Sequence, residues 1–134
     1  MTPAPAPAPL TPTILVIEDY ADTRELMASM LRRSGYHVIE AEDGIEGLLK
    51  ASGTYPDLII LDLALPEMDG VETARRIHQM PKLSRTPIFV VSALLTKEVE
   101  AEVRAAGCTE VFSKPFEVDA LLSKVRAVVS NSRA

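Results

Sequence analysis

Polar side chains of catalytic type follow four of the strand-like apolar runs in this sequence. Glu18 and Asp19 follow the first run, Asp62 the third, Ser92 the fourth and Lys114 the fifth. Taken singly, an acidic pair after a strand suits a solvated loop or a helix cap, a lone Asp suits a turn, and a lone Lys suits the surface. Because the carboxyl ends of parallel strands meet at one sheet edge, their joint placement predicts one shared site.

The carboxylates of this set predict a bound cation. Carboxylates held close together repel one another and need a compensating positive charge. A ligand set of oxygens, with no thiolate or paired imidazole, selects a hard ion, and Mg²⁺ typically takes one or two carboxylates plus phosphate oxygens. We therefore expect Asp19 and Asp62 to bind Mg²⁺ directly, with Glu18 acting through water and a backbone carbonyl completing the set.

A carboxylate beside Mg²⁺ is suited to nucleophilic attack on phosphorus. We expect Asp62 to accept a phosphoryl group as an aspartyl-phosphate while the metal neutralises the developing charge. Lys114 would pair with one phosphoryl oxygen, and the Ser92 hydroxyl would hydrogen-bond another. The Ser92 bond would draw the loop after the fourth strand inward, so we expect this loop to be the switch element.

Short β-branched and apolar runs predict the strands that position these side chains. They are ILVI at 14–17, HVIEA at 37–41, DLIIL at 57–61, PIFVV at 87–91 and EVFS at 110–113. Three of the runs are nearly continuous, which is typical of parallel strands covered by helices on both faces. Their alternation with helical segments predicts an α/β fold with a doubly wound, five-stranded parallel sheet.

Amphipathic segments between and after the strands predict the helices. They span about 22–34, 44–52, 70–79, 96–106 and 117–130. Carboxylate caps three residues before a Glu are expected at three helix starts, in the pairs Asp22 with Glu25, Asp43 with Glu46 and Asp69 with Glu72. One apolar stripe of the last helix is expected to face the sheet, and it comprises Val118, Leu121, Leu122, Val125, Val128 and Val129.

Length, charge and composition exclude several classes of protein. A chain of 134 residues with a net charge of −5 fits one domain and lacks the basic balance of a protein that binds nucleic acid or anionic lipid. No apolar run approaches the ~20 residues needed for membrane insertion. The single Cys108 and the separated His37 and His78 have no metal-ligand spacing, so we expect a structural thiol and a cytoplasmic location.

The N-terminal segment differs in composition from the remainder. Residues 1–12 read MTPAPAPAPLTP, a pattern that favours extended polyproline II and supplies no packing face. We expect a Pro/Ala-rich flexible arm at 1–12, one folded domain at 13–130 and a C-terminal tail at 131–134. A docking motif for a proline-reading module is the alternative for the arm.

The combined motifs resemble two-component response-regulator receiver domains over residues 13–130. The strings that carry the resemblance are ILVIEDY, LIILDLALPEMDG, VVSA and SKPF, in the family's order and spacing. The chain is similar to the stand-alone, single-domain type of this family, such as the chemotaxis response regulator. The resemblance implies a flavodoxin-like (βα)5 receiver fold with strand order 2-1-3-4-5.

The same resemblance implies functional roles for particular residues. It implies that a histidine kinase or a phosphotransfer protein donates the phosphoryl group to Asp62. It also implies that Asp19, Asp62 and the backbone carbonyl of Ala64 ligate Mg²⁺, and that the peptide bond between Lys114 and Pro115 is cis. Such a bond costs only about 0.5–1 kcal/mol before proline.

Several positions depart from the family pattern. Val111 stands three residues before the lysine, where receivers usually carry a switch Tyr or Phe, and strand alternation sends Phe112 to the opposite face to fill the core. Ala64 and Leu94 have no hydrogen-bonding side chain to orient an attacking water, so we expect slow loss of the phosphoryl group. Leu94 and Leu95 suit either an exposed partner-binding patch or the cap of the following helix.

Three functions follow as hypotheses. The first is a single-domain response regulator that signals by phosphorylation-dependent binding of an unidentified downstream protein, and that catalyses only its own phosphorylation and dephosphorylation. The second is a pseudo-receiver docking module that acts without phosphorylation. The third is an aspartate-nucleophile phosphatase, which would need a general acid two residues after Asp62, where this chain has Ala64.

Overall fold

A parallel sheet forms the centre of the molecule. The computed structural model describes residues 11–133, and the greater part of the expected Pro/Ala-rich arm lies outside them. The strands are β1 (Thr13–Ile17), β2 (His37–Ala41), β3 (Leu58–Asp62), β4 (Ile88–Ser92) and β5 (Glu110–Ser113). The helices are α1 (Ala21–Arg33), α2 (Gly44–Thr54), α3 (Gly70–Gln79), α4 (Lys97–Ala105) and α5 (Val118–Arg133), with a short 3-10 turn, η1 (Pro81–Leu83), after α3.

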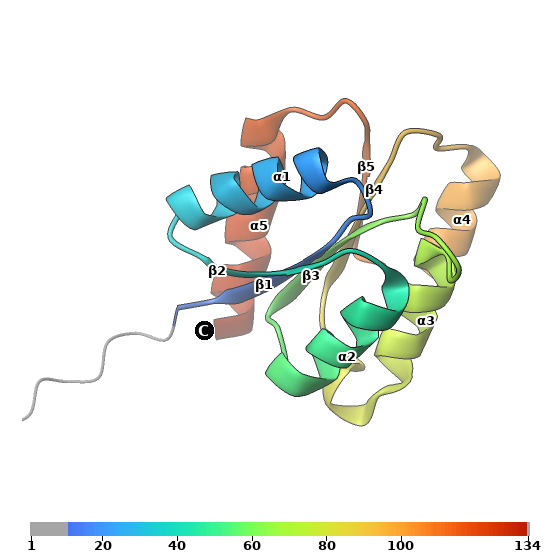
Figure 1. Ribbon diagram of the computed structural model, residues 1–134, viewed down its shortest axis with the longest axis horizontal. Coiled ribbons are helices and arrows are strands. Elements are labelled where there is room, and N and C mark those ends of the chain that lie inside the picture. The colour runs from blue at the N-terminus through green and yellow to red at the C-terminus, as the bar shows by residue number, and fades with distance from the viewer. Residues whose placement is uncertain (1–10, 134) are drawn as a thin grey trace, which may run out of the picture.

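The strand order confirms the expected doubly wound architecture. The five strands pair in parallel in the order β2-β1-β3-β4-β5. Figure 1 shows α1 and α5 on one face of the sheet and α2 and α3 on the other. Strand order therefore reverses beside β1, and parallel α/β sheets bind their ligands outside the carboxyl ends of the strands at such a point.

Alternating strand residues divide the core into two layers. On one face, Ile14, Val16, Phe89 and Val91 pack under α1 and α5. On the other face, the alternate strand residues pack with Ala51, Ala74, Ile77 and Val103 of the remaining helices, and they comprise Leu15, Ile17, Ile59, Leu61, Ile88 and Val90. Two-sided burial explains the nearly continuous apolar runs of the sequence.

Two of the three expected carboxylate caps are present. The side chains of Asp43 and Asp69 accept hydrogen bonds from the amides of Glu46 and Glu72, at 2.7 and 2.9 Å. The prediction for Asp22 was wrong, because α1 begins at Ala21 and Tyr20 takes the N-cap position without a side-chain hydrogen bond. Asp22 lies instead in the first turn, where a negative charge still complements the helix dipole.

The C-terminal helix differs from the expectation at both ends. Leu121, Val125 and Val129 are buried against the sheet as expected, but Val118 is 39% exposed. The prediction for Val118 was wrong because the first turn of α5 extends past the packed part of the apolar face. The helix also continues to Arg133, so part of the segment expected as a tail is helical.

His78 links α3 to the end of α4. Its Nδ1 lies 3.1 Å from the carbonyl oxygen of Ala106, and its Nε2 lies 2.9 Å from that of Thr86. Gly107, at φ +91°, leaves space for the ring, since a Cβ there would lie 2.6 Å from Nδ1. His78 therefore has structural partners at both ring nitrogens.

Within residues 11–133, no helix is long and apolar enough to cross a membrane.

The single cysteine, Cys108, is a core residue. It is 7% exposed and packs in the layer under α2, α3 and α4. Burial raises the pKa of its thiol to about 11. The thiolate is the reactive form, so this thiol should be chemically inert in the folded protein.

We expect Cys108 to react slowly with an aromatic disulfide reagent near neutral pH until urea unfolds the chain. The matched control combines Cys108→Ser with Thr109→Cys, because position 109 is exposed. We expect the control thiol to react about 100-fold faster in the folded state. Equal rates for the two folded proteins would contradict the burial of Cys108.

Candidate functional site

The polar strand ends meet at one edge of the sheet. The loops that follow β1, β3, β4 and β5 all leave the sheet at this edge (Figure 1). Asp62 and Ser92 are the last residues of β3 and β4, and the backbone amide of Lys114 donates to the Ser92 carbonyl at 2.8 Å. Parallel pairing alone thus brings the ends of four strands to a common position.

Lys114 lies between two buried carboxylates. Its Nζ donates to Oδ2 of Asp62 at 2.7 Å and to Oε1 of Glu18 at 2.9 Å. The side chain of Lys114 is 25% exposed, whereas those of Glu18 and Asp62 are 5% and 9% exposed. The peptide bond between Lys114 and Pro115 is cis, as the sequence resemblance implied. Three of the predicted site residues are therefore in direct contact.

The pKa values of the two carboxylates shift in opposite directions. Burial raises the pKa of Glu18, and its hydrogen bond from Lys114 offsets only part of that effect. Burial also acts on Asp62, but hydrogen bonds from Lys114 and from the Ala64 amide outweigh it and hold the pKa of Asp62 below its usual value. The two neighbouring carboxylates likewise outweigh burial at Lys114 and raise the pKa of its ammonium group. Asp62 is thus the carboxylate that stays ionised.

The backbone after β3 supports Asp62. The amide of Ala64 donates to Oδ1 of Asp62 at 2.9 Å, and the amide of Gly70 donates to the Leu63 carbonyl at 3.1 Å. A Cβ at Gly70 would lie 2.6 Å from both the Asp62 carbonyl oxygen and the Leu63 Cα. The start of α3 therefore packs directly on the carboxyl end of β3, and only glycine permits this approach.

Ser92 and Leu94 form the opposite wall of the site. The Ser92 hydroxyl is bonded within its own loop, donating to the Leu94 carbonyl at 3.3 Å and accepting from the Leu94 amide at 3.2 Å. Because both of these bonds are to Leu94, the predicted phosphoryl contact of Ser92 would require this local pair to open. Leu94 is 83% exposed and borders a groove of about 310 Å³ between α3 and α4, which Ala64 and Val99 also line.

The donor set suits a hard divalent cation. Asp19 is exposed at the end of β1, beside the buried Glu18, and Ala64 is exposed two residues after Asp62. The carboxylates of Glu18, Asp19 and Asp62 and the backbone carbonyl of Ala64 offer only oxygen ligands, which are the donors that Mg²⁺ prefers. The carboxylates also outnumber the single Lys114 ammonium, so a divalent ion would neutralise the remaining negative charge.

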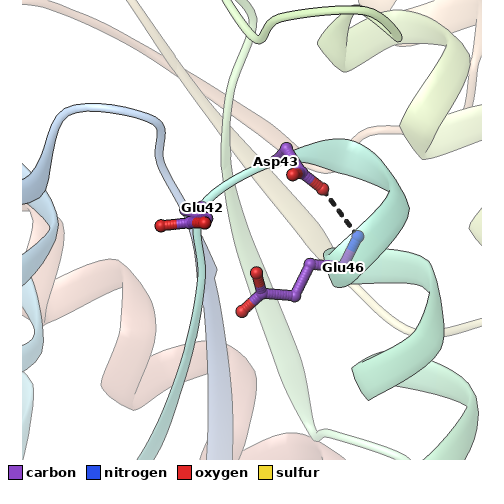
Figure 2. A group of neighbouring side chains, drawn as sticks. All are labelled: Glu42, Asp43 and Glu46. Atoms are coloured by element: carbon purple, nitrogen blue, oxygen red, sulfur yellow. Dashed lines mark hydrogen bonds between the residues drawn. The ribbon is translucent and has the colours of Figure 1, made fainter.

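A second acidic group lies at the start of α2. Within the described part of the chain, Glu42, Asp43 and Glu46 are the three side chains whose potential ligand atoms all lie within 4.8 Å of one another. Figure 2 shows Asp43 accepting the Glu46 amide hydrogen. The Glu46 carboxylate pairs with Lys50 at 2.7 Å. Helix capping and an ion pair account for this group, so we assign no metal to it.

The position where receivers usually carry a switch aromatic has an aliphatic side chain in this chain. Val111 packs against the core layer under α2, α3 and α4. Phe112 points to the opposite layer, where its ring centroid lies 5.6 Å from that of Phe89. The expected core role of Phe112 is confirmed.

Sequence reasoning did not anticipate three supports of the site. It paired Lys114 with a phosphoryl oxygen but not with Glu18, because residue types do not give rotamers. It also gave no role to the Ala64 amide or to the absent side chain of Gly70. The Gly that follows the Asp69 cap was the available signal, since a helix start at Gly suggests a close backbone approach.

We expect Lys114→Met to destabilise the fold by about 2 kcal/mol near pH 7, because it leaves two buried carboxylates without a cation. The loss should shrink as the pH falls toward about 4. The usual values are 3.8 for Asp62 and 4.5 for Glu18, and without Lys114 both carboxyls titrate at higher pH in the folded state. The folded variant then binds more protons than wild type in acid, which favours folding.

Urea unfolding at both pH values measures this difference. The control is Lys124→Met, because Lys124 is 56% exposed and pairs with Glu110 at 3.5 Å, so its loss should change stability by under about 0.5 kcal/mol. A Lys114→Met penalty that grows in acid would contradict the ion-pair assignment.

Known proteins resemble this chain in sequence and in fold. The response regulator receiver domain family model matches residues 14–126. The polar-differentiation response regulator DivK of Brucella ovis is 28% identical over 123 residues, which cover 92% of this chain and 100% of DivK. The chemotaxis protein CheY4 of Vibrio cholerae superposes with a TM-score of 0.85 at 30% identity, with 89% of this chain and 99% of that chain covered.

A further similar structure concerns the metal. The receiver domain of the sensor histidine kinase PA1611 from Pseudomonas aeruginosa has a TM-score of 0.83 at 27% identity, covering 90% of this chain and 99% of that one. That structure holds a magnesium ion coordinated in its active-site cleft. Since the family match spans most of the sequence, this chain belongs to the response regulator receiver domain family of two-component signalling proteins.

Proposed function

We propose that this protein is a single-domain response regulator that accepts a phosphoryl group on Asp62 and signals by phosphorylation-dependent binding of another protein. The observation that carries the proposal is the buried Asp62 carboxylate, held by Lys114 at 2.7 Å and by the Ala64 amide at 2.9 Å. Membership of the receiver family supports a histidine kinase or a phosphotransfer protein as the donor. The cytoplasm is the proposed location.

The proposed chemistry is an in-line transfer to one carboxylate oxygen of Asp62. That oxygen forms a bond to phosphorus as the bond from phosphorus to the donor nitrogen breaks. The donor keeps the electron pair and takes a proton from water, and the second Asp62 oxygen becomes the carbonyl of the acyl phosphate. The chain catalyses only this step and the later hydrolysis of its own aspartyl-phosphate, in which water takes the phosphoryl group and inorganic phosphate is released.

The chain's own groups have separate parts in this transfer. Lys114 keeps Asp62 ionised beforehand and then moves its ammonium group to a phosphoryl oxygen. Asp19, Asp62 and the Ala64 carbonyl would hold Mg²⁺, with Glu18 reaching it through water. When bound, this ion neutralises charge that develops on the transferred group. The Ser92 hydroxyl would leave Leu94 for another phosphoryl oxygen.

The output would begin at the loop that carries Ser92. Ser92, Ala93 and Leu94 line the groove beside α4, and Ala64 lines its other side. A loop displacement toward Asp62 changes the shape of this groove and the position of the exposed Leu94. Because Val111 carries no ring, the proposed readout depends on this loop and not on an aromatic flip.

We expect one phosphoryl group to be added when the protein is incubated with Mg²⁺ and acetyl phosphate, as followed by intact mass. Asp62→Asn should abolish the adduct. Asp69→Asn is the matched control in the same loop, since Asn retains the cap on Glu72 and the adduct should persist.

The other outcomes distinguish the competing functions. Mg²⁺ binding without an adduct would favour a docking module that works without phosphorylation. Continuous release of phosphate from a phosphoester would favour a phosphatase. An adduct that survives Asp62→Asn would assign the acceptor to another residue.

We expect the aspartyl-phosphate to be long-lived, because Ala64 and Leu94 present no group that orients an attacking water. Leu94→Glu should shorten its half-life about tenfold by adding such a group. Lys97→Glu is the control, since it places an exposed carboxylate farther along the same segment. A wild-type half-life of seconds that Leu94→Glu leaves unchanged would contradict this prediction.

A further inference from the structure

Every polar group of Glu18 has a partner in the folded chain. Its side-chain oxygens accept hydrogen bonds from Lys114 at 2.9 Å and from the Tyr20 amide at 3.2 Å. Its amide donates to the Ala41 carbonyl at 3.0 Å. Its carbonyl accepts from Nη1 of Arg24 at 2.9 Å. The backbone of the proposed metal loop is thus fixed from both sides, by β2 and by α1.

Arg24 connects this loop to the neighbouring strand. Its Nε lies 3.4 Å from Oε1 of Glu40 on β2, and its side chain is only 14% exposed. Its backbone amide donates to the Tyr20 carbonyl at 2.9 Å. A guanidinium can bond a carbonyl and a carboxylate in two directions at once, which the single ammonium of Lys cannot reproduce in the same geometry.

Glu40 is itself held in place. Its other carboxylate oxygen pairs with Arg32 at 3.3 Å, and its backbone carbonyl accepts from Lys50 at 2.6 Å. The Glu40 side chain is 28% exposed, and its own contacts make it a fixed partner for Arg24. This series of contacts runs from Glu40 through Arg24 to Glu18, the residue that precedes Asp19.

We propose that Arg24, anchored by Glu40, is a positioning residue for the phosphorylation site. It holds the Glu18 carbonyl and thereby sets where the Glu18 and Asp19 carboxylates stand toward Mg²⁺. The inference rests on the proposed function for its consequence in phosphorylation, but its effect on Mg²⁺ affinity is measured separately. The side-chain partners of Arg24 are the Glu18 backbone carbonyl and the Glu40 carboxylate, so it acts on the site through the backbone.

Charge and positioning predict opposite effects of removing Arg24. A cation near the site repels Mg²⁺, so if Arg24 acted only through its charge, its loss would tighten Mg²⁺ binding. If it positions the carboxylates, its loss weakens binding, and partners that orient metal ligands typically contribute 10–100-fold in metal affinity. The sign of the change decides between the two roles.

The test compares Arg24→Met with wild type in Mg²⁺ titrations of the full chain. Backbone amide shifts of Asp19 and Tyr20 report the Kd, and phosphorylation by acetyl phosphate is measured across Mg²⁺ concentrations. We expect the Kd of Arg24→Met to rise roughly tenfold. The rate at saturating Mg²⁺ should stay within about twofold of wild type, because the loss then falls on binding alone.

Three further variants keep the test decisive. Arg32→Met removes the other arginine on Glu40 without touching Glu18, so its Kd should stay within about twofold of wild type. Glu40→Gln should give a smaller rise than Arg24→Met. Arg24→Lys keeps the charge and most of the stem, and it should also weaken Mg²⁺ binding. It replaces Arg24→Met in the test if that variant fails to fold.

Several outcomes would overturn the inference. They are a lower thermal midpoint with an unchanged Kd, a tighter Kd in Arg24→Met, and wild-type protein that does not bind Mg²⁺. If wild type binds Mg²⁺ but gains no phosphoryl group, the proposed function fails, whereas a weakened Kd in Arg24→Met still supports the positioning role.

Discussion

The Lys114 ammonium between Glu18 and Asp62 is the interaction on which the site depends. Lys114 follows the edge strand β5, whereas its partners belong to β3 and to the end of β1. The lysine therefore reaches across the end of β4 to join residues 52 and 96 positions away. Two buried carboxylates would repel each other without it, so the same cation stabilises the folded chain and holds the proposed nucleophile.

Asp62 and Glu18 have different surroundings, which suit them to different roles. Asp62 receives both the ammonium and a backbone amide, and its pKa is held low. The pKa of Glu18 is raised by burial, so it gives up its proton less readily. A nucleophile must be ionised before a donor arrives, whereas a group that acts on a metal through water can ionise as the metal binds. The geometry thus matches the two proposed roles.

Hydrophobic periodicity predicted most of the fold, because strands that are buried on both faces, such as β3 and β4, are nearly continuous apolar runs in the sequence. It predicted the site edge as well, since Asp62 and Ser92 stand where apolar runs end. It failed at Asp22, where the backbone bond from Arg24 to the Tyr20 carbonyl starts the helix early. Strand order came from the family resemblance, and side-chain directions, such as that of the Ser92 hydroxyl toward the Leu94 backbone, are set by packing that residue types do not encode.

Placement of Val111 and Phe112 constrains how a signal can leave the site. Phe112 is committed to the core with Phe89, and the close-packed interior makes its rotation costly. Val111 offers no ring to move. The Ser92 loop, by contrast, is held at its tip by two long hydrogen bonds to Leu94, at 3.2 and 3.3 Å, and carries an exposed apolar side chain. Because this loop would exchange weak local bonds for a charge-assisted one, it is the element that the proposed phosphorylation would displace at least cost.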